Sequence, residues 1–167
     1  MVKATSISPW TLCLPDTPLG AVKLTFTSKG LAGLDFADCR PQKAEVPEPF
    51  ILQTREAAQV LKEYFAGRDP TLGRLALDLK GTPFQLKVWE ELAKIPWGRT
   101  ISYGELAARL GRPKAARAVG RACAANPIPI LIPCHRVIAR DGALGGYSAG
   151  LERKRRLLAH EKKGGRP

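Results

Sequence analysis

The sequence changes character at Gly81-Thr82-Pro83, and no other feature limits the possible folds as strongly. Before this point, short segments alternate between apolar and polar residues as strands do, while after it apolar residues recur at helical spacing. The charge changes at the same place. Residues 1–83 hold 10 Lys/Arg and 9 Asp/Glu, whereas residues 84–167 hold 17 and 6. We therefore predict an α+β protein with two domains, residues 1–81 and residues 82–167.

The first half predicts a small antiparallel sheet and one helix. Residues 19–36 have the pattern of a hairpin, and an earlier strand is expected near residues 11–14. A loop rich in proline and charge follows at residues 41–49. Residues 54–65 then carry apolar side chains at helical spacing, and Gly67 is expected to end this helix.

The second half predicts mostly helix. Residues 84–94 have helical spacing behind Thr82, which suits an N-cap position. Ser102-Tyr103-Gly104-Glu105 fits a capping box at the start of a short helix that ends before Gly111-Arg112-Pro113. Pro113 suits the start of the next helix, residues 114–125. Two short helices joined in this way predict a helix-turn-helix of the winged-helix-like type.

Composition limits the classes of function. The basic second half indicates a polyanionic partner, most often nucleic acid, with a solubility surface as the alternative. No apolar run approaches membrane-spanning length, and residues 1–5 lack the apolar core of a signal peptide. We therefore expect no membrane association and an intracellular protein, cytoplasmic if the source is prokaryotic. Cys13, Cys39, Cys123 and Cys134 contain no C-x-x-C pair, so reduced thiols are expected, with neither a disulfide framework nor a cysteine-rich zinc site.

A thiol and an imidazole, Cys134 and His135, stand side by side within the apolar segment 132–137. Cysteine reacts as the thiolate, and a neighbouring imidazole can take its proton directly or through one water. A cysteine alone in this setting would be interpreted as a small buried apolar residue, but His135 favours an activated nucleophile. Glu161 is a candidate to orient His135. His160 is interpreted as a structural residue or as a solvated charge near the end of a C-terminal helix.

The helix at residues 114–125 is unusual for a recognition helix because it carries almost no long polar side chains for base edges. Its small residues allow a close approach to a narrow groove. Arg117 is the side chain near its middle that could reach into a base stack. Tight Ala and Gly packing, with Arg117 as a solvated charge, is the alternative that the helix alone leaves open.

Four blocks of sequence together resemble one known family. They are Ile101-Ser102-Tyr103, residues 113–120, residues 126–137 and Gly145-Gly146-Tyr147-Ser148. The chain is identified from them as a member of the methylated-DNA protein-cysteine methyltransferases, the O6-alkylguanine-DNA alkyltransferase family. The similarity runs over roughly residues 82–162, and its Cys-His segment is highly specific. The first half resembles the family's variable amino-terminal bracing domain only in size and strand content.

The resemblance implies direct DNA repair without a cofactor. Cys134 would take the alkyl group from O6-alkylguanine, and also from O4-alkylthymine, and would keep it, so that each molecule acts once. His135 would act as the base through a water, Glu161 would orient His135, and Asn126 would fix a hinge turn. The damaged base would be flipped out of the duplex to reach the thiol.

The resemblance also implies DNA-contacting residues in a monomer that approaches the minor groove. Arg117 would fill the gap in the stack, and Tyr103 would crowd the phosphate. The remaining candidates for contact with DNA or the flipped base are Ser102, Pro129, Val137, Tyr147 and Ser148. No metal site is expected, because residues 1–83 contain no His. Residues 161–167 are interpreted as a frayed, basic tail.

Three other functions fit parts of the pattern. A protein of the same fold could recognise alkylated DNA without repairing it, but such relatives lack the acceptor cysteine that Cys134 supplies. A helix-turn-helix transcription regulator fits the charge but not a recognition helix poor in base-reading side chains. A Cys-His hydrolase would need an oxyanion hole and a peptide cleft, for which the sequence carries no signature.

Overall fold

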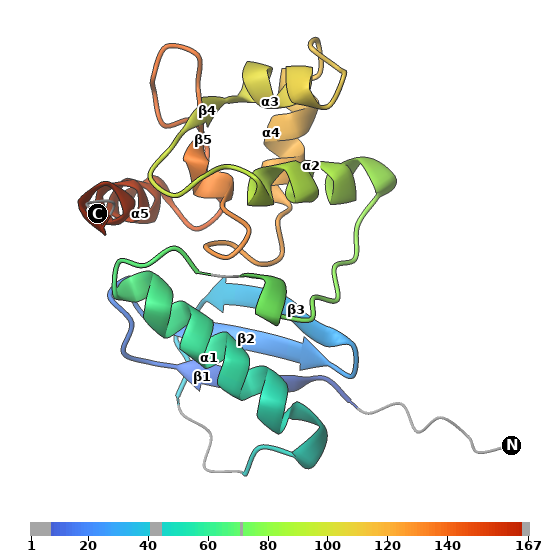
Figure 1. Ribbon diagram of the computed structural model, residues 1–167, viewed down its shortest axis with the longest axis vertical. Helices are drawn as coiled ribbons and strands as arrows, with labels where there is room; N and C mark the ends of the chain where they lie inside the picture. Colours follow the sequence, from blue (N-terminus) through green and yellow to red (C-terminus); the bar gives the residue numbers. More distant parts are fainter. Residues whose placement is uncertain (1–7, 41–44, 71, 165–167) are drawn as a thin grey trace, which may run out of the picture.

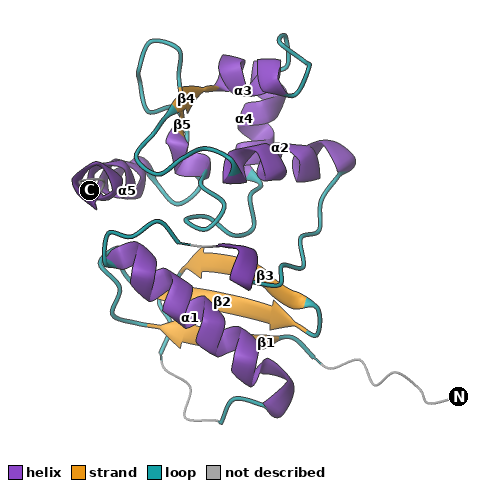
Figure 2. Cartoon of the chain, in the orientation of Figure 1, coloured by secondary structure: helices purple, strands orange, loops and turns teal. Residues whose placement is uncertain are grey.

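A three-stranded antiparallel sheet, crossed by one long helix, forms the first half of the molecule (Figure 1; Figure 2). The computed structural model describes residues 8–40, 45–70 and 72–164. The sheet has the order β1-β2-β3, and its strands are β1 (Trp10–Leu14), β2 (Val22–Thr27) and β3 (Gly30–Phe36). The predicted hairpin and the earlier strand are both present. The expectations for residues 1–5, 41–44 and 165–167 lie outside the described residues.

The central strand shows why the sheet folds as it does. Val22, Leu24 and Phe26 are fully buried, and the residues between them are half-buried, so one face of β2 lies on the core. Gly30 begins β3 with a φ of +148°. A Cβ there would lie 2.2 Å from the carbonyl oxygen of Ala76, so only glycine allows this approach.

Helix α1 (Ile51–Phe65) begins three residues before the predicted start at Thr54. The Thr54 hydroxyl donates to the carbonyl of Phe50 inside the first turn, a back-bond that a sequence pattern does not distinguish from a helix start. A short 3-10 turn, η1 (Glu48–Phe50), leads into the helix. The buried face of α1 carries Ala57, Val60, Leu61 and Tyr64, as the spacing predicted, while Phe65, predicted on the same face, is only partly buried.

The second half is mostly helical, as predicted. Its elements after η2 (Leu72–Arg74) are α2 (Pro83–Ala93), β4 (Ile101–Ser102), α3 (Tyr103–Arg109), α4 (Ala116–Ala124), η3 (Cys134–Arg136), β5 (Val137–Ile138) and α5 (Leu151–Gly164). Thr82 and Ser102 each form a complete capping box, with Gln85 and Glu105 respectively. The two-residue strands β4 and β5 pair in parallel beside the helix-turn-helix, and the sequence did not predict them.

Two expectations about helix ends need correction. Helix α4 begins at Ala116 and not at Pro113, because Arg112 and Ala115 close a turn first. Helices α3 and α4 still pack against each other across this turn, as a helix-turn-helix does. The expectation of a frayed tail from residue 161 is wrong, because α5 continues to Gly164 and Glu161 is fully buried.

Helix α5 and the loop before Cys134 both contact the first half of the molecule. The amide of Leu34 in β3 donates to the carbonyl of Pro127 over 2.8 Å. Arg153 of α5 donates to the carbonyl of Leu19 and lies over the ring of Phe36, 4.7 Å from its centroid. The division into domains at residue 81 stays a prediction. No helix in the described part of the chain is long and apolar enough to cross a membrane.

Cys13 and Cys39 form a disulfide, so the expectation of reduced thiols is wrong for this pair. Their Cα atoms lie 5.8 Å apart, within the range that a disulfide requires. The bond joins β1 to the segment after β3, and strand pairing brings these positions together across 26 residues of chain. Spacing alone did not indicate this pairing. Cys123 and Cys134 are free and buried.

We expect loss of this disulfide to destabilise the protein without disturbing the Cys134 site. Closing a loop of 26 residues restricts the unfolded chain and contributes about 3 kcal/mol in the chain-entropy model. Urea unfolding of the double variant Cys13→Ser, Cys39→Ser against the parent measures this loss. Unreduced peptide mapping that finds both thiols free in the parent would contradict the pairing.

Candidate active site

The loop that carries Cys134 is folded around the side chain of Asn126. The Asn126 Nδ2 donates to the carbonyl of Ile132 over 2.7 Å, and its Oδ1 accepts from the amide of Ile128 over 3.0 Å. Ile130, between these anchors, has a φ of +75°, which is unfavourable for a β-branched residue. The two hydrogen bonds of Asn126 therefore hold the loop together just before the 3-10 turn η3.

Cys134 begins η3, and its side chain is almost wholly buried at the base of a pocket. Burial raises the pKa of the Cys134 thiol, and this effect exceeds the opposing ones. Those come from a hydrogen bond from Asn126, from the charge of Lys154 and from the amides of Cys134 and His135. The resting thiol is therefore protonated at neutral pH, and it needs a base before it can attack.

His135 is fully buried beside this thiol, and its Nε2 lies 2.6 Å from Oε1 of Glu161. Burial lowers the pKa of His135, while Glu161 acts in the opposite direction without overcoming it, so the resting imidazole is neutral. An ionised carboxylate only accepts hydrogen bonds, so Nε2 must carry the ring hydrogen. Nδ1 keeps its lone pair and bonds no group in the described part of the chain. His135 is thus oriented as a base.

Glu161 is the most heavily bonded side chain of the site. Its carboxylate accepts from Tyr64 Oη at 3.0 Å, His135 Nε2 at 2.6 Å, Arg136 Nε at 2.9 Å, Arg136 Nη2 at 3.0 Å and the Gly98 amide at 3.1 Å. Burial alone would raise the pKa of Glu161, but His135 and Arg136 lower it to about 2. The group is therefore ionised at all physiological pH values.

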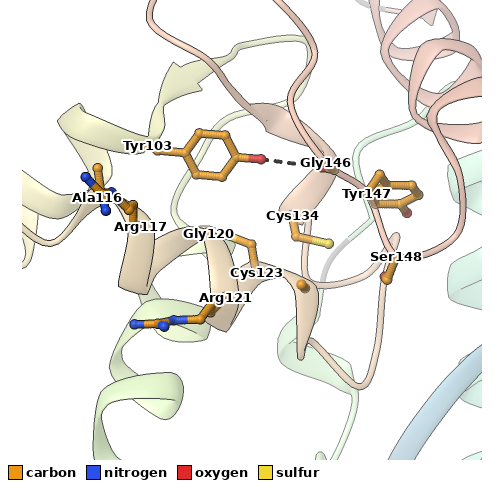
Figure 3. Close-up of a pocket in the computed structure, with 11 residues that line it drawn as sticks. Tyr103, Ala116, Arg117, Gly120, Arg121, Cys123, Cys134, Gly146, Tyr147 and Ser148 are labelled. Carbon is orange, nitrogen blue, oxygen red and sulfur yellow. Dashed lines mark hydrogen bonds between the residues drawn. The ribbon is translucent and has the colours of Figure 1, made fainter.

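An open pocket of about 640 Å³ lies above Cys134 (Figure 3). Tyr103, Tyr147 and Ser148 line it from the side of α3 and of the loop before α5, and the small residues Gly120 and Ala124 line it from α4. In Figure 3 the sulfur of Cys134 points between α4 and the loop that carries Tyr147 and Ser148. The volume is in the range of small-ligand sites and would admit one planar heterocycle.

Tyr103 and the glycine-rich loop fit closely together. The Tyr103 hydroxyl donates to the carbonyl of Gly146 over 3.4 Å. Gly145 has a φ of +65°, and a Cβ at this position would lie 2.9 Å from the Tyr103 ring. Any side chain at residue 145 would therefore push the loop away from Tyr103 and distort the pocket.

The other predicted contact residues do not all meet at this pocket. Arg117 is exposed and lies at its rim on α4, pointing away from Cys134 (Figure 3). Ser102 caps α3 and does not line the pocket. Pro129 lines a neighbouring cavity that also touches Asn126 and Ser148. Val137 is buried in β5.

Sequence reasoning missed four residues that the fold brings to the site, namely Tyr64, Cys123, Arg136 and Lys154. Tyr64 and Cys123 looked like core residues of their helices. Helical spacing offers a signal for Lys154, because residues 154, 157 and 161 form the buried face of α5. A lysine on such a face marks a buried charge.

Lys154 is fully buried, and its ammonium group anchors the loop that carries Gly146 and Tyr147, called the pocket loop below. Its Nζ donates to the carbonyls of Val137 at 2.6 Å and Gly146 at 3.2 Å, and it lies 5.9 Å from the centroid of the Tyr103 ring. Burial lowers the pKa of Lys154, while the nearby thiols of Cys134 and Cys123 oppose this. Burial also raises the pKa of Cys123 to about 12, so this second thiol stays protonated.

The described residues contain no group of three or more His, Cys, Asp or Glu side chains that could hold a metal ion. His160 lies half-buried in α5, and its Nε2 donates to the carbonyl of Tyr64 over 2.7 Å. This nitrogen is therefore used in packing α5 against α1.

This chain is similar in sequence and fold to known proteins. A family profile described as "6-O-methylguanine DNA methyltransferase, DNA binding domain" matches residues 83–163. A methylated-DNA–protein-cysteine methyltransferase of Methanosarcina barkeri is 44% identical over 149 residues, which cover 87% of this chain and 93% of that protein. One of Shigella flexneri is 42% identical over 159 residues, covering 95% and 92%.

A crystal structure of Mycobacterium tuberculosis OGT in complex with DNA is similar with a TM-score of 0.79 and 42% identity, covering 92% of this chain and 93% of that one. The fold and the site together define a DNA-binding transferase that uses a cysteine. The chain belongs to the methylated-DNA–protein-cysteine methyltransferase family.

We expect Glu161→Gln to destabilise the protein by about 3–5 kcal/mol, because it leaves the buried Arg136 guanidinium without a counter-ion. The folded pKa of Glu161 is lowered to about 2. Its contribution is therefore complete above the ordinary carboxyl pKa and is lost as the pH falls through about 2. Urea unfolding as a function of pH measures this, and the Gln variant should lack this part of the acid dependence.

Glu152→Gln is the matched control, since Glu152 is an exposed partner of Arg155 on the same helix. It should change stability by less than about 1 kcal/mol. Equal stability of the two variants would contradict the role of Glu161 as the buried counter-ion.

Proposed function

We propose that this protein repairs DNA by moving the alkyl group of an O6-alkylguanine onto Sγ of Cys134, once per molecule. The observation that carries this assignment is a buried thiol beneath an open pocket, next to His135. Glu161 holds the imidazole of His135 in the tautomer that leaves Nδ1 free to accept a proton. Family membership supports the same reaction. The protein is thus a methylated-DNA–protein-cysteine S-methyltransferase that is consumed by its single turnover.

The transfer is a displacement at the alkyl carbon. His135 Nδ1 takes the thiol proton, directly or through one bound water, and the thiolate forms a bond to the carbon. The bond from that carbon to O6 breaks, its electron pair stays on the purine, and the proton returns to the departing base. Lys154 supports the transient negative charge on sulfur, since its charge favours the thiolate. The resulting thioether is a poor electrophile, so the thiol is not regenerated.

The target oxygen lies inside a duplex, so we propose that the damaged nucleotide is flipped into the pocket. Tyr103 and Tyr147 would flank the base, the Ser148 amide would face its oxygen, and Pro129 and Val137 would shape the edge of the site. Arg117 at the rim would fill the gap left in the stack. O4-alkylthymine would be accepted in the same way, because it presents an alkyl group on a similar exocyclic oxygen.

We propose that α3 and α4 form the DNA surface and enter the minor groove. Exposed basic side chains gather on these helices and on the turn between them, namely Arg109, Arg112, Lys114, Arg117 and Arg121. They supply phosphate contacts, while the small residues of α4 allow a close approach. Ser102 acts indirectly here, by capping the helix that carries Tyr103.

We also propose that residues 1–81 form a bracing domain and residues 82–167 the catalytic domain of a monomer. A DNA substrate places this activity inside the cell, in the cytoplasm if the source is prokaryotic. Disulfides are rare in reducing compartments, so the Cys13–Cys39 disulfide is unusual for a cytoplasmic protein.

We expect a duplex with one O6-methylguanine to transfer one methyl group to Cys134, with saturation at one group per protein. Intact-protein and peptide mass spectrometry over a range of DNA ratios measures this. Cys134→Ser should abolish the transfer and leave DNA binding largely intact. Methylation that persists in this variant would move the acceptor to Cys123, the other free thiol of the pocket. Tight lesion binding by the parent without a mass change would instead indicate a recognition-only protein of the same fold.

We expect Arg117→Ala to slow repair in duplex DNA by about tenfold or more, because flipping a base costs a few kcal/mol that a filled stack offsets. Reaction with the free base O6-benzylguanine should change little, since no base is flipped. Arg155→Ala removes another exposed charge, from α5, and is the control for charge alone. Equal slowing with both substrates would rule out the proposed role of Arg117.

A further inference from the structure

The first half of the chain contributes a side chain to the buried relay. Tyr64 lies near the end of α1, on the face turned toward the second half, and is fully buried. Its hydroxyl donates to Oε1 of Glu161 over 3.0 Å, across 97 positions of sequence. Oε1 is the same atom that accepts from His135 Nε2 over 2.6 Å. Tyr64 and His135 therefore share one oxygen of the relay carboxylate.

The ring of Tyr64 is as constrained as its hydroxyl. It meets the Trp97 ring nearly edge-on, with centroids 5.1 Å apart, and the His135 ring at 6.5 Å with an interplanar angle of 84°. The indole nitrogen of Trp97 donates to the main-chain carbonyl of Glu161 over 2.8 Å. The Tyr64 hydroxyl thus has a fixed direction. Burial, and to a smaller extent the charge of Glu161, raises the pKa of Tyr64. The hydroxyl therefore stays protonated at neutral pH and can donate to the carboxylate.

We propose that Tyr64 is a positioning residue for alkyl transfer, because its hydroxyl shares Glu161 Oε1 with His135 and so limits how strongly the carboxylate holds a proton on the imidazole. This inference rests on the proposed function and extends it to the first half of the chain. Bracing by α1 then has a chemical consequence, since α1 sets the basicity of the relay as well as supporting its shape.

The direction of the effect follows from the competition for Oε1. Without the hydroxyl, more of the carboxylate's negative charge acts on His135, which stabilises the imidazolium. The pH at which the imidazole becomes free to accept the thiol proton then rises. The titratable and charged groups that face this cluster are Glu161, Lys154 and His160 from α5, His135, Arg136 and Cys134 from η3, Asp69 after α1, and Tyr147 from the pocket loop.

Tyr64→Phe tests the proposal, because it removes the hydroxyl and keeps the ring. Thr54→Val is the matched control: Thr54 is a buried residue of the same helix whose hydroxyl bonds Phe50 and not Glu161. For each protein, the rate of Cys134 alkylation is measured against pH with O6-benzylguanine and, separately, with iodoacetamide, and peptide mass spectrometry assigns the modified thiol.

We expect Tyr64→Phe to move the acid limb of both profiles upward by about 0.5 to 1 pH unit, a three- to tenfold loss of rate on that limb. Thr54→Val should keep the parent midpoint. Site-specific 3-fluorotyrosine at position 64 keeps the fold and strengthens the donor, so it should move the midpoint downward.

An unchanged midpoint in Tyr64→Phe, equal shifts in Tyr64→Phe and Thr54→Val, or no downward shift with fluorotyrosine would overturn the proposal. A parent that reacts with iodoacetamide but not with O6-benzylguanine would instead refute the proposed function, and the iodoacetamide profiles would still decide the role of Tyr64.

Discussion

Five hydrogen bonds converge on the carboxylate of Glu161, and they come from α1, from the turn after α2 and from η3. Burying a charge is expensive unless it is paired and bonded, and here the Arg136 guanidinium supplies the opposite charge in bidentate form. The three segments can therefore satisfy this group only when each is in its native position. The same carboxylate orients His135, so folding and reactivity depend on one ion pair.

Burial keeps the Cys134 thiol unreactive in the resting protein, while the groups beside it allow it to react with a bound substrate. Its burial raises the pKa of the thiol, which protects the sulfur from adventitious reagents. The neutral imidazole of His135 can accept the thiol proton, and the charge of Lys154 favours the thiolate, so the thiolate can form when a substrate fills the pocket. An acceptor that is consumed by one reaction gains from this arrangement, because an exposed thiolate would be lost to unrelated chemistry.

Local chemistry made much of the fold predictable. The N-cap at Thr82, the capping box at Ser102, the alternation of β2 and the apolar face of α1 all depend on near neighbours in the chain, and each appears as predicted. The larger misses lie where distant segments decide. The two-residue pairing of β4 with β5 and the disulfide each require a partner that local sequence does not reveal.

The sequence by itself established the family, the Cys-His pair and the basic helix-turn-helix, because each of these is a contiguous motif whose chemistry can be recognised from neighbouring residues. Only the tertiary structure decided which groups control that pair. Tyr64, Arg136 and Lys154 meet at the site because helices α1 and α5 pack around η3, and burial there changes what each side chain can do. A tyrosine that looks like core in sequence becomes a donor to a catalytic carboxylate once water is excluded, since hydrogen bonds and charges act most strongly where no solvent competes.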